Sequence, residues 1–377
     1  MSMDEAEIVE SREEHEFQEY NVYPERLLEW QVSNADAGAS IDFPPYNISG
    51  DSNFPDAVKH TEEWRKFYDR RRKRSAKMAL RMGIRLQEMR SEGDRDALDY
   101  IYAPVIHGKP HPKRTHSYLS RWHGAIVKAL DFWPRGWTLK PEPSSSFGQI
   151  ALHLAYAEEC LLNNGEDEPN TDYLHVLMVG GLLQKCLIMY FARDVDAMVT
   201  SDASTYAAGG KRRQFDLPKT ARRRCVIISN RDDEEREDSA MDATRLDRYP
   251  CRCQVCSTVE RTAGFEFITE GTDSARNATM NLHNLHQALS IERTLDALLR
   301  EEDTQIAETG GEPTGSEFWR FIKTLTPEKR VEDLYRAMDY IRLTKEEGID
   351  EANRQYRILW DSSSGRTVLP ASSSADW

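Results

Sequence analysis

The sequence predicts an α/β protein in which strand–helix units are arranged around a parallel sheet. Apolar segments of strand length alternate with longer segments whose apolar residues recur at helical spacing. Glycine or polar residues follow the strands, as in His107-Gly108 and Gly180-Gly181. This alternation is typical of βα units, in which the residues after each strand gather at one edge of the sheet. The chain of 377 residues is also long enough to bury a sizeable core.

The strand–helix alternation extends from the helix that begins near Tyr23 to Asp202. Apolar or small residues predict strands over 35–42, 100–106, 136–139, 173–179 and 196–199. Helical periodicity predicts helices over 23–31, 56–89 with an interruption near Arg74, 116–130, 147–163 and 182–192. The intervening helices return the chain to the start of the next parallel strand.

The rest of the chain is predicted to be mainly helical. We expect helices over 282–301, 318–347 and 349–360, with Gly348 separating the last two, and a glycine-rich linker over 308–315. The acidic start and the serine-rich end have the composition of flexible or disordered segments. The predicted divisions are a flexible N-terminus over 1–20, a sheet domain over 21–245, a metal-binding segment over 246–305, a helical tail over 316–361 and a disordered end over 362–377.

The distribution of charge along the chain bears on the cellular location of the protein and on its binding partners. The formal net charge is −14, no apolar run approaches 18 residues, and the N-terminus is acidic without an apolar signal core. Arginine outnumbers lysine. This acidic, lysine-poor composition favours a cytoplasmic protein of a halophilic host, and a virus-encoded protein is the alternative. Two basic runs, Arg70–Arg74 and Lys211–Arg224, are either phosphate contacts for a nucleic acid or solvated faces.

A compact cysteine motif predicts a metal site. Cys251, Cys253 and Cys256 fall within six residues, and His283 follows on a predicted helix. Three thiolates and one imidazole complete a tetrahedral set for Zn²⁺, so the metal would be structural. His286 is the alternative fourth ligand because it lies three residues further along the same helical face. The remaining alternative is that these are unrelated reduced cysteines beside a solvated histidine.

The motif and several strand ends together resemble the tRNA-guanine transglycosylase family. The zinc site of that family is a Cys-x-Cys-x-x-Cys motif followed by a histidine within a Leu/Ile-His-Asn-Leu run, similar to Leu282-His283-Asn-Leu285 here. Similar strand passages are Pro24-Glu25 to Gln31 with Asp42-Phe-Pro-Pro-Tyr46, Val105-Ile-His107-Gly108, Gly136-Trp-Thr-Leu139, Tyr173 to Gly181, and Asp196 to Asp202. The resemblance spans roughly residues 20–290.

The resemblance implies roles for individual residues. Asp202 matches the catalytic nucleophile of the family, and Asp42 matches the carboxylate that recognises the guanine-type base. His107 stands where the family has a base-recognising glutamine, and Gly108 follows it as the family glycine does. Lys140 is a departure, because the family has glycine there.

Two further positions complete the implied substrate pocket. Gly180 matches a strand-end glycine of the family. Tyr46 is an expected stacking wall for a nucleotide flipped out of its helix, and Tyr206 is the alternative.

The resemblance also implies a fold and a reaction. The family fold is a (β/α)8 TIM barrel with a zinc-binding subdomain. Because the family's first three strands and its general-base aspartate find no match before Pro24, we expect an N-terminally incomplete barrel. The family exchanges guanine in a nucleic acid for a 7-deazaguanine through a covalent aspartyl–glycosyl intermediate. Ala203-Ser-Thr-Tyr206 resembles members that modify DNA more than those that modify tRNA.

The implied cofactor is Zn²⁺, and the implied partners are DNA or tRNA and a 7-deazaguanine base, without a membrane. A second chain, or a second copy of this one, would supply the missing barrel half. The alternative function is that of a non-catalytic, zinc-stabilised nucleic-acid-binding subunit of a transglycosylase heteromer. A third alternative is an unrelated zinc-bearing interaction protein.

Overall fold

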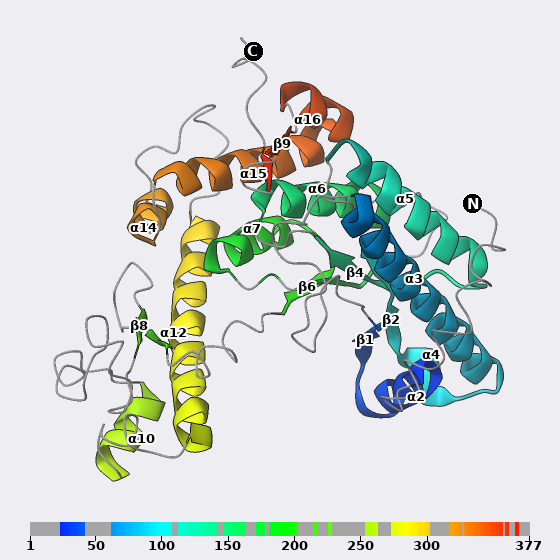
Figure 1. Cartoon of the computed structure of the whole chain (residues 1–377), viewed down its shortest axis with the longest axis horizontal. Coiled ribbons are helices and arrows are strands. Elements are labelled where there is room, and N and C mark those ends of the chain that lie inside the picture. The colour runs from blue at the N-terminus through cyan, green and yellow to red at the C-terminus, as the bar shows by residue number, and fades with distance from the viewer. Residues whose placement is uncertain are drawn as a thin grey trace. The chain divides into compact units, whose positions relative to one another are not determined.

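Two compact units divide the chain, one from residues 1–142, 156–176 and 196–200 and the other from 143–155, 177–195 and 201–377. Both combine helices with short strands, so the predicted α/β class is confirmed (Figure 1). The predicted boundaries near residues 20, 245 and 305 lie outside the described residues. The computed structural model describes residues 23–41, 62–107, 112–141, 146–162, 171–177, 179, 181–202, 214–216, 225–227, 253–262, 273–301, 317–325, 328–356, 359–361 and 366–368.

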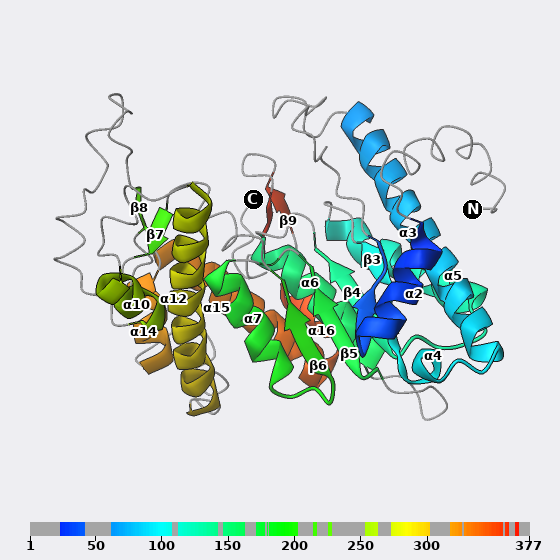
Figure 2. The same cartoon turned by 90° about the horizontal axis from the view of Figure 1, so that it is seen from below.

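A sheet with parallel pairing forms the centre of the first unit (Figure 2). Its strands, in spatial order, are β3 (Val105–His107), β4 (Gly136–Lys140), β5 (Tyr173–Val176) and β6 (Met198–Ser201). β3 is parallel to β4, and β4 is parallel to β5. The strands predicted over 136–139, 173–179 and 196–199 are therefore present, close to their predicted positions.

The two earlier predicted strands are also present. β1 (Ala37–Ala39) pairs in parallel with β2 (Ile101–Ala103), and β3 follows β2 after Pro104. Pro104 has no N–H to contribute to a strand ladder, which explains the break. Its carbonyl still accepts a hydrogen bond from the Thr138 amide at 3.0 Å. β2 and β3 thus form one extended segment, as the sequence predicts for 100–106.

Helices α2 (Pro24–Asn34) and α3 (Glu62–Ser91) pack against each other in the first unit. The side chains of Met78, Met82 and Leu86 are nearly or fully buried along one face of α3. The predicted interruption near Arg74 is wrong, because α3 continues through it. Arginine is a good helix former, and Arg74 is buried in this helix, so nothing at that position ends it.

Gln31 connects helix α2 to β1 and to Tyr100, the residue before β2. Gln31 donates from Nε2 to the Ala39 carbonyl at 3.1 Å and accepts from the Tyr100 hydroxyl at 2.9 Å. Gly38 allows this approach, because a Cβ there would lie against the Tyr100 hydroxyl. The remaining helices of the first unit are α4 (Arg95–Asp99), α5 (Pro112–Ala129) and a π-helical turn over Glu158–Leu162.

Helix α7 (Leu182–Ala192) is central to the second unit, where it packs against α12 (Asp273–Glu301) and α15 (Glu328–Glu347). Polar contacts reinforce this packing. Lys185 Nζ lies 2.6 Å from Glu292 Oε1, and Lys345 Nζ donates to the Phe191 carbonyl at 3.0 Å. Helix α6 (Phe147–Ala157) precedes α7, and most of it belongs to this unit.

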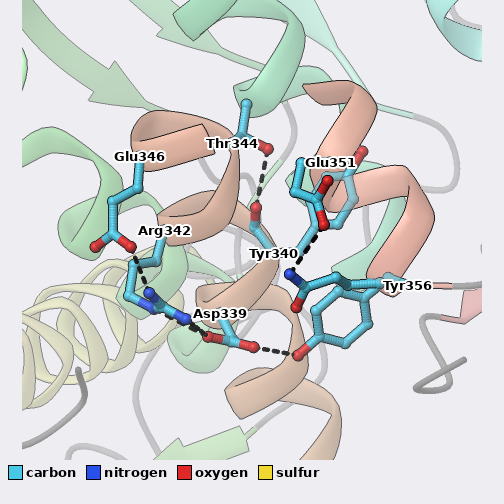
Figure 3. Close-up of polar contacts among 8 residues, drawn as sticks. Asp339, Tyr340, Arg342, Thr344, Glu346, Glu351 and Tyr356 are labelled. Atoms are coloured by element: carbon cyan, nitrogen blue, oxygen red, sulfur yellow. Dashed lines mark hydrogen bonds and ion pairs between the residues drawn. The ribbon is translucent and has the colours of Figure 1, made fainter. Parts of the chain in front are cut away.

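The C-terminal helices are fixed by a hydrogen-bond network (Figure 3). Arg342 donates to Asp339 Oδ1 at 2.7 Å, while the Tyr356 hydroxyl donates to Asp339 Oδ2. Gly348 has a φ of 88° between α15 and α16 (Ile349–Gln355), a conformation that favours glycine, so it separates these helices as predicted. Helix α14 (Glu317–Leu325) precedes α15, so the helix predicted over 318–347 is two helices.

The end of the chain differs from the prediction. α16 ends at Gln355 rather than near Trp360, and β9 (Leu359–Asp361) pairs antiparallel with β10 (Arg366–Val368). β10 lies within the range 362–377, for which the sequence predicts disorder. Trp360 faces Thr367 in this ladder, and aromatic and β-branched residues favour such pairs. A second antiparallel pair, β7 (Gln214–Asp216) with β8 (Cys225–Ile227), was also not predicted. No described helix is long and apolar enough to cross a membrane.

Candidate metal centre and strand-end residues

The cysteine motif leads into α10 (Gln254–Thr262), which contacts α12 in the second unit. Cys253 precedes the first residue of α10 and acts as its N-cap. The Cys256 amide donates to Cys253 Sγ at 3.3 Å, and the Ser257 amide donates to the Cys253 carbonyl at 2.9 Å. Two sulfurs thus lie at the positive end of a helix, where its amides favour thiolate charge.

His283 brings α12 into contact with these sulfurs. Its Nδ1 lies 3.1 Å from Cys256 Sγ and 3.5 Å from Cys253 Sγ. In a tetrahedral site with Zn–S bonds of about 2.3 Å and Zn–N bonds of about 2.0 Å, the S···N separation would be about 3.5 Å. The three donor atoms all lie within 4.8 Å of one another, so they could hold one metal ion.

The cluster is shielded from water. His283 is 0% exposed, Cys256 1% and Cys253 5%. His286, the alternative ligand, is exposed on α12 and does not belong to the cluster. The geometry therefore favours His283 over His286. Cys251, the expected fourth ligand, lies outside the described residues.

The other predicted site residues are described only in part. His107 ends β3 and is 3% exposed, whereas Asp202 directly follows β6 and is exposed. These two residues belong to different compact units. Of the predicted site residues within the described ranges, Cys253, Cys256 and His283 come together. The predicted residues outside those ranges are Cys251, Asp42, Tyr46, Gly108, Gly180 and the alternative Tyr206.

Polar side chains on the strands form a group that the sequence did not predict, although His107 was an expected site residue. Lys140 is 2% exposed and pairs in register with His107, while His175 pairs with Thr138. His175 Nδ1 lies 2.8 Å from the Oγ1 atom of Thr200 on β6. The available signal was polar residues at alternate strand positions, because alternate residues share one face of a strand.

Comparisons with known proteins give no assignment: no protein-family model matches the chain, and no curated protein matches it. Interpretation of the centre therefore rests on its own chemistry. Buried thiolate and imidazole donors suit soft or borderline metals such as zinc better than magnesium or calcium, which prefer oxygen.

Proposed function

We propose that Cys251, Cys253, Cys256 and His283 hold a structural Zn²⁺, and that the chain is a guanine transglycosylase with a divergent (β/α)8 barrel. The observation that carries this proposal is the Cys253–Cys256–His283 cluster, because its spacing in the sequence and its buried donors fit the zinc site of that family. A closed set of four protein ligands leaves no position for a substrate, so the metal would stabilise the docking of α10 on α12.

Asp202 is the proposed nucleophile. It is exposed directly after β6, and parallel-sheet folds carry their chemistry at the carboxyl ends of strands. Its carboxylate would attack the anomeric carbon as guanine leaves, giving an aspartyl–glycosyl intermediate that a 7-deazaguanine base then displaces. Asp42 would accept hydrogen bonds from the amidine edge of each base.

The remaining proposed contacts concern the base and the nucleic acid. His107 and Gly108 at the end of β3, with Gly180 after β5, would contact the base, and Tyr46 would stack on it. DNA is favoured over tRNA because the residues after Asp202 resemble those of DNA-modifying members. A second chain or a second copy would complete the barrel.

A non-catalytic, zinc-stabilised subunit that binds nucleic acid is the second candidate. The observation that favours it is the buried pair His107 and Lys140. These side chains stand where the family has a glutamine and a glycine, and a lysine side chain occupies space that a glycine leaves to the base. In that case Asp202 would have no catalytic role.

Exchange of labelled guanine separates the two candidates. The purified, zinc-loaded chain would be incubated with duplex DNA and, separately, with tRNA. Asp202→Asn removes the nucleophile, and Asp196→Asn is the matched control because Asp196 is an exposed carboxylate before the same strand. Label that enters one nucleic acid, is retained in Asp196→Asn and is lost in Asp202→Asn would support the enzyme. Stable binding of nucleic acid without any exchange would favour the non-catalytic subunit.

A further inference from the structure

The two faces of the β3–β4–β5 sheet carry opposite kinds of side chain. Residues that pair in register on parallel strands point to the same side, and this side alternates along each strand. One side is wholly apolar, and its side chains are all 0% exposed: Ile106, Trp137, Leu139, Leu174 and Val176. This is the expected character of a packed face.

The opposite side is mainly polar, although Val105, which pairs with Thr138, and Gly136 also lie on it. His107 pairs with Lys140, and Thr138 pairs with His175, so all four point to this side. Parallel sheets usually bury apolar residues on both faces, so a polar face needs a cause. The residues that we call the polar face are His107, Thr138, Lys140, Tyr173, His175 and Thr200.

Hydrogen bonds extend the polar face across β5 and β6. His175 Nδ1 lies 2.8 Å from Thr200 Oγ1, and the Thr200 hydroxyl donates to the Tyr173 hydroxyl at 3.0 Å. The rings of Tyr173 and His175 are stacked, with centroids 6.3 Å apart. These contacts fix the orientation of the three side chains, all of which are half-buried. His107 and Lys140, by contrast, are only 3% and 2% exposed, so a ligand that reaches them must displace the atoms that cover them.

The cationic end of the polar face lies at the carboxyl ends of β3 and β4. His107 and Lys140 are register partners, so their backbones lie about 4.8 Å apart, the usual spacing between neighbouring strands. Lys140 lies about 7 Å along the strands from the level of His175, since residues two apart on a strand are separated by that distance. A lysine side chain is long enough to share a ligand with a histidine at this separation.

We propose that the polar face binds a phosphate group, either free or as the 5′-phosphate of a nucleoside monophosphate. An ammonium group, imidazoles and hydroxyls supply donors, and the polar face carries no carboxylate among its described residues. A phosphate offers several acceptor oxygens and a negative charge, which match this set. The inference does not depend on base exchange, because phosphate binding can be measured without it.

Calorimetric titration of the full chain at low ionic strength tests the proposal, with inorganic phosphate, dGMP and guanosine as ligands. Phosphate and dGMP should both bind, and guanosine should bind much more weakly. Lys140→Met and His175→Gln should each weaken phosphate and dGMP binding roughly tenfold or more, the effect of losing a charged hydrogen bond. Lys128→Met is the control, because Lys128 is exposed at the end of α5 in the same unit, and it should bind as wild type.

Two results would overturn the proposal: no binding of phosphate or dGMP by the folded wild-type chain, or unchanged binding by both variants. If Lys140→Met fails to fold, Thr200→Val is titrated with phosphate in its place, because it removes only a half-exposed hydroxyl with little change of shape. Weaker phosphate binding by Thr200→Val would support the proposal, and unchanged binding would count against it. Asp202→Asn should retain phosphate binding while losing base exchange. A chain that exchanges guanine but binds no phosphate would refute this inference and leave the proposed function intact.

Discussion

Replacing His283 by alanine should destabilise the second unit through the metal centre. His283 is fully buried and provides the contact from α12 to both cysteine sulfurs. α10 spans nine residues, and helices of this length are marginal in isolation. Its position on α12 should therefore depend on the bound metal. Losing one ligand should release that constraint.

The expected magnitude follows from the metal-binding free energy. Structural zinc sites contribute about 10–16 kcal/mol through four ligands, so one ligand accounts for about 3 kcal/mol. In a folding unit of roughly this size, 1 kcal/mol shifts the melting temperature by about 2–4 °C, so His283→Ala should lower it by about 6–12 °C. Thermal melting by circular dichroism, with metal content measured on the same sample, tests this expectation.

His286→Ala is the matched control. His286 lies on the same helix, three residues away, and is exposed, so its loss should change stability by less than about 0.5 kcal/mol. A chelator should lower the melting temperature of the wild type and His286→Ala, with little further effect on His283→Ala. If His283→Ala kept the wild-type melting temperature and a full complement of metal, His283 would not be a ligand of a structural metal.

Three other predictions concern contacts away from the metal. Lys185→Met should cost roughly 2 kcal/mol, because the Lys185–Glu292 pair is mostly buried, and a double-mutant cycle with Glu292→Gln in urea should give a coupling well above 0.5 kcal/mol. Burial lowers the pKa of His123 to about 4, so the folded state resists a proton that the unfolded chain binds near pH 6.5. Stability should therefore fall as the pH drops from 6.5 towards 4, and urea melts should show a smaller fall in His123→Gln; an equal fall would contradict this cause. Tyr356→Phe should cost about 1–2 kcal/mol in thermal melts by removing the hydrogen bond to Asp339, and an unchanged midpoint would count against that contact.

Local patterns in the sequence were sufficient to predict the strands of the sheet. Val105–His107 and Tyr173–Val176 are short runs rich in apolar and aromatic residues, bounded by proline, glycine or polar residues, and such signals act within a few residues. The predicted break near Arg74 was wrong because a cluster of basic residues does not by itself end a helix, and Arg74 is buried within α3. The short ladder of β9 and β10 depends on pairing between segments, which periodicity does not reveal.

The two candidate sites also show the difference between local signals and contacts between distant segments. Cysteine spacing predicts a metal site, but His283 and His286 lie three residues apart on a helix, so sequence alone cannot choose between them. The packing of α10 against α12 places His283, and not His286, beside the two cysteine sulfurs. The polar face was missed because its members come from separate strands, and only the register places Lys140 beside His107 and His175 beside Thr138.

X-ray absorption at the zinc edge, combined with metal analysis of the purified full chain, tests the metal centre that supports the proposed family most directly. We expect one zinc per chain, with three sulfurs at about 2.3 Å and one nitrogen at about 2.0 Å. Cys251→Ser should reduce the sulfur count to two, since Cys253 and Cys256 remain beside His283. A chain without zinc, or a shell of oxygen donors, would contradict the centre and remove the main support for the transglycosylase proposal.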